Sequence, residues 1–147
     1  LVERLVLLRE EVLLLSEPLR EGVALDKMPV ADHGNLAYML ALLLVERGKT
    51  EEAVDWLDKA AAELPGNVRI RYNQGLLLSQ LNRREEALAA LRAGLAQAPD
   101  DPDLLYTLIY LHAIAGEQEE AFGYVKRMRK AAPQDPRLLA IEPYWTK

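Results

Sequence analysis

Adjacent glutamates are the side chains in this sequence whose type and spacing best suit catalysis. Paired carboxylates serve as general acid and general base when their surroundings separate their pKa values. The pairs recur every 34 residues, and an alanine follows each one: Glu51–Glu52, Glu85–Glu86 and Glu119–Glu120. Because the pattern is periodic, we interpret the pairs as helix-start residues, where negative charge complements the helix dipole.

The two histidines are the next candidates. His33 stands beside Asp32, but neighbouring residues rarely face one point, so we interpret it as a helix-start residue. His112 falls where Leu44 and Leu78 stand one and two periods earlier, which predicts a core histidine with satisfied hydrogen bonds. The chain has no Cys, which excludes thiolate metal sites, disulfides and Cys nucleophiles. No phosphate-binding or nucleophile motif occurs. We therefore expect no enzyme, no catalytic or cofactor-binding residue and no metal site.

Charge and hydropathy narrow the class of partner. The chain has 147 residues and a formal net charge of −5. Proteins that bind the phosphates of nucleic acids usually carry a basic surface, so no nucleic-acid partner is expected. No apolar run is long enough to predict a membrane span. Charged residues from Glu3 to Glu11 interrupt the opening leucines, which argues against a signal peptide. Composition fixes no compartment; a cytoplasmic location is the expectation. Since the chain starts at Leu1, we interpret it as a piece of a longer protein or a processed product.

A 34-residue repeat organises the middle of the chain. Three copies without gaps cover residues 34–67, 68–101 and 102–135. Beyond the Glu-Glu-Ala triplets, three columns are identical in all copies: Tyr38/Tyr72/Tyr106, Leu43/Leu77/Leu111 and Pro65/Pro99/Pro133. A fixed period of this length is the signature of stacked helical repeats.

Turn and cap residues divide each copy into two helices. Gly48, Asn82 and Gly116 suit the left-handed conformation just past a helix end, and the repeated prolines stop the second helix. Asn67, Asp101 and Asp135 are suitable N-caps for the helix that follows. The predicted helices are 34–47, 50–63, 68–81, 84–97, 102–115 and 118–131.

The pattern resembles the tetratricopeptide repeat (TPR) family. In the second copy, the chain reads YNQGLLLSQLNRREEALAALRAGLAQAP from Tyr72 to Pro99. The resemblance covers residues 34–135 and implies an all-α, right-handed α-solenoid of three helix-turn-helix repeats. It also implies that the first helices line a concave groove that holds a peptide or a partner helix.

The resemblance implies a set of groove-facing residues in each copy. In the first copy they are Asn35, Tyr38, Leu42, Val45 and Glu46. In the second they are Arg69, Tyr72, Asn73, Leu76, Ser79 and Gln80. In the third they are Asp103, Tyr106, Thr107, Tyr110, Ala113 and Ile114. The tyrosines either bind a partner or stiffen the solenoid, and both roles stay open here. The residues of the family's carboxylate clamp and of its asparagine ladder are absent.

The flanks leave further alternatives. Residues 1–33 are expected to form an N-terminal helical cap, with helices over 1–15 and 18–25 and a connector over 26–32. The alternative is a helix that docks on another domain or self-associates through residues 1–15. Residues 136–147 are expected to be a short C-terminal capping segment, in which Tyr144 and Trp145 either fold back or anchor a partner. Two functions follow: a non-catalytic protein-interaction scaffold, or the TPR tail of a larger bacterial enzyme or multihaem cytochrome.

Overall fold

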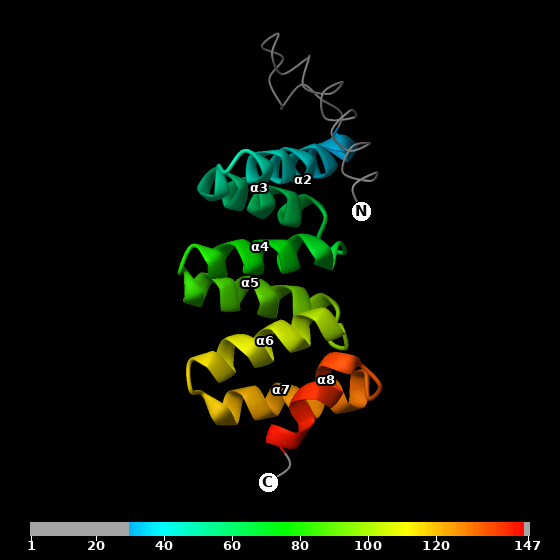
Figure 1. The fold of residues 1–147 in the computed structure, drawn as a ribbon. Coiled ribbons are helices and arrows are strands. Elements are labelled where there is room, and N and C mark those ends of the chain that lie inside the picture. Colours follow the sequence, from blue (N-terminus) through cyan, green and yellow to red (C-terminus); the bar gives the residue numbers. More distant parts are fainter. Residues whose placement is uncertain (1–29, 146–147) are drawn as a thin grey trace.

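The computed structural model describes residues 30–145, and their side chains from His33 onward. Every regular element in this range is helical (Figure 1). The elements are α2 (Val30–Glu46), α3 (Thr50–Glu63), α4 (Val68–Gln80), α5 (Arg84–Gln97), α6 (Pro102–Ile114), α7 (Gln118–Ala131), α8 (Pro136–Ile141) and the 3-10 helix η2 (Glu142–Tyr144). None of the described helices is long and apolar enough to cross a membrane.

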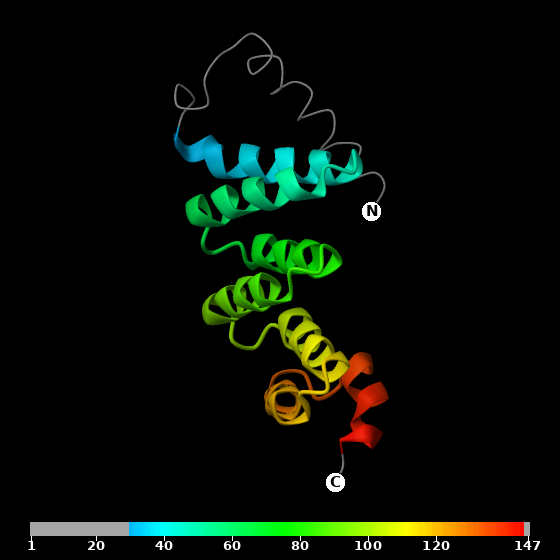
Figure 2. The ribbon, with the colours of Figure 1, turned by 90° about the vertical axis from the view of Figure 1, so that its left-hand side faces the viewer.

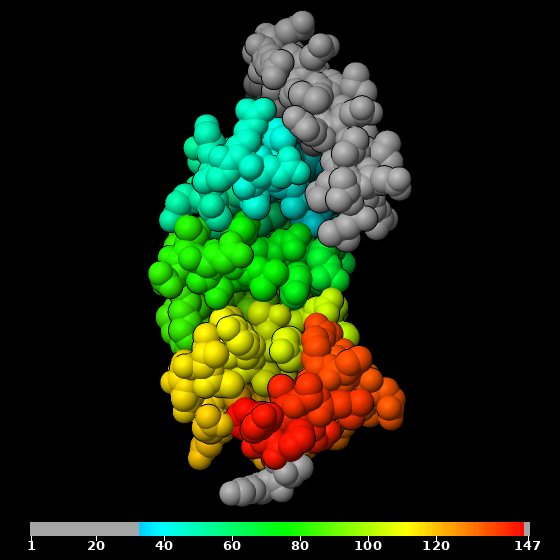
Figure 3. Space-filling view, viewed as in Figure 1, coloured from blue at the N-terminus to red at the C-terminus, as the bar shows by residue number. Residues whose placement is uncertain are grey.

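The helices form antiparallel pairs that stack on one another. The pairs are α2 with α3, α4 with α5 and α6 with α7, and α3 packs on α4 as α5 packs on α6. Seen from the side, α4, α6 and α8 lie on one face of the stack and α5 and α7 on the other (Figure 2). The repeats build one elongated column (Figure 3). The all-helical solenoid predicted from the 34-residue period is therefore confirmed.

Helix boundaries follow the sequence prediction to within one residue, except at the start of the first helix. The connector expected over 26–32 is wrong for its last three residues, because α2 already begins at Val30. No proline or glycine falls between Val30 and Asp32 to stop a helix from extending backward. The predicted helices over 1–15 and 18–25, and self-association through 1–15, lie outside the described residues.

Turn and cap chemistry explains why each helix ends where it does. Gly48, Asn82 and Gly116 have φ of 74°, 58° and 77°, the predicted left-handed conformation. The Asp101 side chain accepts from the backbone N–H groups of Asp103 and Leu104, as expected of an N-cap. Asp135 caps α8 in the same way. The prediction is wrong for Asn67, whose side chain makes no cap hydrogen bond, because its ψ of 85° departs from the extended values, 116° and 125°, at the two aspartates.

A continuous aliphatic core runs through the stack. Its largest fully buried side chains include Leu57, Ile70, Leu88, Leu91, Leu104, Leu105 and Leu108. Helices α4 and α5 of the second repeat approach each other closely, since a Cβ built on Gly75 falls 2.5 Å from Leu91 Cγ. The glycine therefore lets α4 and α5 pack at a distance that a larger residue does not allow.

The C-terminal segment folds back on the last repeat. Trp145 stacks on Phe122 of α7 with ring centroids 6.1 Å apart, and Arg129 pairs with Glu142. Tyr144 stays 83 % exposed. The sequence left open whether Trp145 folds back on the last repeat or anchors a partner, and in the structure it folds back.

Candidate functional site

The predicted groove residues lie on α2, α4 and α6, and several of them bond to one another across repeats. Asn73 Nδ2 donates to the Tyr38 hydroxyl oxygen at 2.8 Å. Burial raises the pKa of Tyr38, although the hydrogen bond from Asn73 and the charge of Arg69 oppose the rise. This contact joins the first helices of the first and second repeats.

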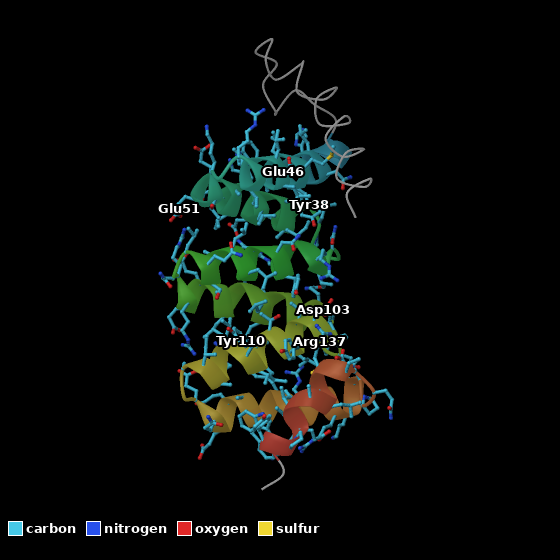
Figure 4. All side chains as sticks on the ribbon, viewed as in Figure 1. Tyr38, Glu46, Glu51, Asp103, Tyr110 and Arg137 are labelled. Atoms are coloured by element: carbon cyan, nitrogen blue, oxygen red, sulfur yellow. The ribbon has the colours of Figure 1, made fainter. Side chains whose placement is uncertain are left out.

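A chain of charges continues the connection along the same edge. Asp103 accepts from Arg69 at 2.9 Å and from Arg137 at 2.8 Å, and these three residues are spaced one period apart. Burial favours the protonated form of Asp103, but the hydrogen bonds from both guanidinium groups lower its pKa overall. Figure 4 places Asp103 and Arg137 together at the edge where α6 and α8 begin. We call Arg69, Asp103 and Arg137 the charge ladder.

The tyrosine column is partly structural. Tyr38, Tyr72 and Tyr106 are half-buried against the core. Arg69 lies over the ring of Tyr72 at 4.7 Å from the centroid, and Arg137 lies over Tyr106 at 5.0 Å. The core and neighbouring side chains therefore cover part of each tyrosine ring, while any binding role remains a prediction.

Exposed apolar side chains lie further along the same helices. Tyr110 is 54 % exposed and Ile114 64 % exposed, and both belong to α6 (Tyr110 is labelled in Figure 4). Asn35 is also exposed. Thr107, however, is buried, and its hydroxyl donates to the Asp103 carbonyl oxygen at 2.7 Å. Its predicted groove position is wrong, because residue 107 turns toward the core.

A cavity of about 210 Å³ opens between α2 and α4. Leu42 and Leu76, one period apart, line it together with the buried side chains of Leu57 and Leu77. The polar groups of Asn73 and Gln80 also line it. We call this cavity the Leu42–Leu76 pocket.

Sequence reasoning missed two features of this face. It did not single out Arg137, although the position is one period after Asp103 and therefore belongs to the same column. It also did not predict the Leu42–Leu76 pocket. Periodicity indicates which side chains share a face, whereas a cavity depends on how closely two helices approach.

His112 lies in the core as predicted, but its polar atoms are only half satisfied. The side chain is 2 % exposed, and its ring stacks on Tyr124 with centroids 5.6 Å apart. Nδ1 lies 2.5 Å from Glu117 Oε2, while Nε2 is buried without a hydrogen-bond partner within residues 33–145. The expectation of a fully satisfied histidine is thus wrong for one nitrogen, since the ring occupies a place that leucine fills in the other copies. Hydrogen bonds from His112 and from Arg84 lower the pKa of Glu117.

The recurring glutamate pairs begin the second helices, as expected. Arg83 bonds Glu51 of the preceding repeat at 2.7 Å and Glu86 of its own at 2.5 Å. Within the described part of the chain, no group of three or more His, Cys, Asp or Glu residues is placed to hold a metal ion. His33 lies in α2, and the side chain of Asp32 is outside the described set, so their pairing has no geometry to assess.

The Asp135–Arg137 pair predicts how stability responds to acid. The Arg137 guanidinium donates to both carboxylate oxygens, and this lowers the pKa of Asp135 from 3.8 to about 2. A carboxyl group whose pKa is lower in the folded state than in the unfolded state stabilises the fold at pH values above its unfolded-state pKa. This stabilisation is lost as the pH falls toward the folded-state pKa. We expect the thermal midpoint, followed by circular dichroism, to fall between about pH 4 and pH 2.

Two substitutions isolate this contribution. Asp135→Asn keeps an N-cap side chain but removes the charge, so its thermal midpoint is expected to depend less on pH in that window. Asp100→Asn removes an exposed carboxylate that forms no ion pair with the described residues, and the wild-type slope is expected to remain. Equal slopes for both variants would contradict the assignment.

Comparison with known proteins agrees with this architecture. Two family models described as tetratricopeptide repeat match the chain, one over residues 44–108 and the other over residues 19–68. The second match extends into residues 19–33, which we expected to be a cap outside the repeats. No curated protein matches.

Solved structures share the fold. YrrB, described as a TPR protein with an unusual peptide-binding site, has a TM-score of 0.66 and 23 % identity over 80 % of this chain and 59 % of that one. MamA AMB-1 has a TM-score of 0.59 and 27 % identity over 68 % and 59 %. The Yersinia enterocolitica chaperone SycD, in complex with a peptide of the translocator YopD, has a TM-score of 0.63 and 15 % identity over 76 % and 86 %. The chain thus spans about three fifths of the length of YrrB and of MamA.

The 34-residue period, the three stacked helix pairs, the left-handed turn residues and the two family matches agree. The chain belongs to the tetratricopeptide repeat family.

Proposed function

We propose that this chain is a non-catalytic interaction module that holds a peptide or helical segment of a partner protein against its first helices. The observation that carries the proposal is the strip of exposed apolar side chains beside the Leu42–Leu76 pocket, above all Tyr110 and Ile114. Tyrosine offers a large apolar area and a hydroxyl group at low entropic cost, which suits recognition. Neighbours that bind peptides, YrrB and SycD, support the same class of function.

A pull-down from the lysate of the source organism tests the proposal. The baits are the full chain, the groove variant Tyr110→Ala/Ile114→Ala and the matched control Leu139→Ala/Tyr144→Ala. Leu139 and Tyr144 are 51 % and 83 % exposed, and Tyr144 lines a separate hollow with Phe122 of α7, so the control removes comparable apolar surface away from α2, α4 and α6. All four side chains are exposed, so each variant is expected to fold, which circular dichroism checks.

We expect a partner that the wild type and the control retain and the groove variant loses. Once the partner is identified, its Kd for the groove variant is expected to rise at least about tenfold, or about 1.4 kcal/mol. Equal retention by all three baits would contradict the proposed groove.

A further inference from the structure

The Leu42–Leu76 pocket has the size for one side chain rather than for a small-molecule ligand. Its volume of about 210 Å³ is below the ~300–1,000 Å³ typical of ligand pockets. Leu42, Leu76 and Val45 give it aliphatic walls, and Ala41 lies at its base. An aliphatic or aromatic side chain that enters it leaves water and meets apolar atoms on several sides.

Two amides at the pocket supply hydrogen bonds to the backbone that carries such a side chain. Asn73 uses its NH₂ group on the Tyr38 hydroxyl, which leaves the carbonyl oxygen as an acceptor. Gln80 is exposed, and its amide forms no hydrogen bond within residues 33–145. A peptide N–H and C=O can therefore pair with these groups, in keeping with pockets that combine apolar walls and a few polar anchors.

An unpaired carboxylate sets the charge beside the pocket. Glu46 is four residues after Leu42 on α2, so both lie on one helix face, and Glu46 is one period before Gln80. Glu46, which is labelled in Figure 4, is exposed, and no described residue forms an ion pair with it. The cations of the charge ladder are bound by Asp103 at the other end of the first helices. A cation on the partner is therefore favoured, and a carboxylate is repelled.

We propose that the pocket binds a basic–apolar peptide: one aliphatic or aromatic side chain enters between Leu42 and Leu76, and a neighbouring Lys or Arg pairs with Glu46. The inference rests on the proposed function and specifies its partner. It predicts discrimination against acidic segments, because Glu46 repels a carboxylate that stands in the place of the Lys or Arg.

Selection of random linear peptides displayed on phage, against the full 147-residue chain, tests the inference. We expect enrichment of peptides with Leu, Ile, Met or Phe close to Lys or Arg. The most enriched sequence is then synthesised, together with a version in which Glu replaces the basic residue, and both are titrated by fluorescence anisotropy. The acidic version is expected to bind at least about tenfold more weakly.

Charge reversal on the protein provides the matched comparison. Glu46→Lys is expected to weaken the basic peptide about tenfold and to strengthen the acidic version. Glu52→Lys makes the same change of charge at an exposed position of α3, and both affinities are expected to stay within about twofold of wild type. Val45→Ser reduces the apolar wall at a partly exposed position and is expected to weaken both peptides.

The outcomes separate the two proposals. Enrichment of acidic or purely apolar peptides, no enrichment, or equal effects of Glu46→Lys and Glu52→Lys would overturn the pocket assignment. If such peptides still lose affinity in Tyr110→Ala/Ile114→Ala, the groove function stands without the charge preference. Peptides that bind wild type and every variant equally would count against both.

Discussion

Shortening Leu91 to alanine is expected to lower the free energy of unfolding by about 2–5 kcal/mol, because the side chain is fully buried between α4 and α5. Adding one methyl group opposite it, in Gly75→Ala, is expected to cost about 1–3 kcal/mol. The added Cβ falls 2.5 Å from Leu91 Cγ, so either the Leu91 side chain or the two helices must shift. This strain exceeds the roughly 1 kcal/mol that alanine gains over glycine in a helix.

The double variant Gly75→Ala/Leu91→Ala is expected to cost less than the sum of the two single changes, because the shorter residue 91 makes room for the new methyl group. Gly123→Ala is the control: a Cβ there meets nothing within 4 Å, so alanine is expected to stabilise α7 by up to about 1 kcal/mol. Urea unfolding followed by circular dichroism measures all four variants. Additive costs, or stabilisation by Gly75→Ala, would contradict the close approach of α4 and α5.

Replacing His112 with leucine is expected to raise the free energy of unfolding by about 1–2 kcal/mol. The change removes a buried Nε2 that has no partner among the described residues, and leucine already occupies the equivalent positions 44 and 78. The change also removes the hydrogen bond between His112 and Glu117, but the Glu117 carboxylate keeps its ion pair with Arg84. Lost stacking on Tyr124 offsets part of the gain.

The same unfolding assay measures the effect, and His112→Gln is the comparison. Glutamine keeps a polar group in an apolar site, so it is expected to be less stable than wild type. If His112→Leu were the less stable protein, the imidazole contacts with Glu117 and Tyr124 would outweigh the unsatisfied nitrogen.

The helix pairs could be predicted from the sequence because their determinants are local and repeated. Gly48, Asn82 and Gly116 mark the turns by their conformational freedom, and the prolines mark the ends of the second helices. The 34-residue register begins at Gly34 and so misses the start of α2, although Pro29, directly before Val30, is a residue type that suits a helix start. Asn67 shows a different limit, since its type suits a cap that its backbone does not form.

The sequence predicted the candidate site only as sets of positions spaced 34 residues apart, which share one face of the stacked helices and are called columns here. Tyr110 and Leu42 share a column, yet Tyr110 is exposed and Leu42 lines a pocket. Thr107 follows Tyr106 directly, yet its side chain is buried. The repeat register predicts which side of the helix a residue occupies only to within about one residue, so it could not separate these two neighbours. The bonds that engage Tyr38 and Asp103 depend on side-chain conformations across repeats, which the sequence does not contain.

The charge ladder also governs how easily the solenoid bends. Asp103 holds one guanidinium from the repeat before it and one from the segment after it, so its carboxylate ties α4, α6 and α8 along one edge. These groups are partly exposed, and dissolved salt weakens attraction between exposed charges. The opposite edge, where the turns after the first helices lie, has ties of its own: Arg83 pairs with Glu51 of the repeat before it, and Arg84 pairs with Glu117 of the repeat after it. Partly exposed ion pairs therefore hold both edges of the stack, so we expect the solenoid to bend more easily as the ionic strength rises.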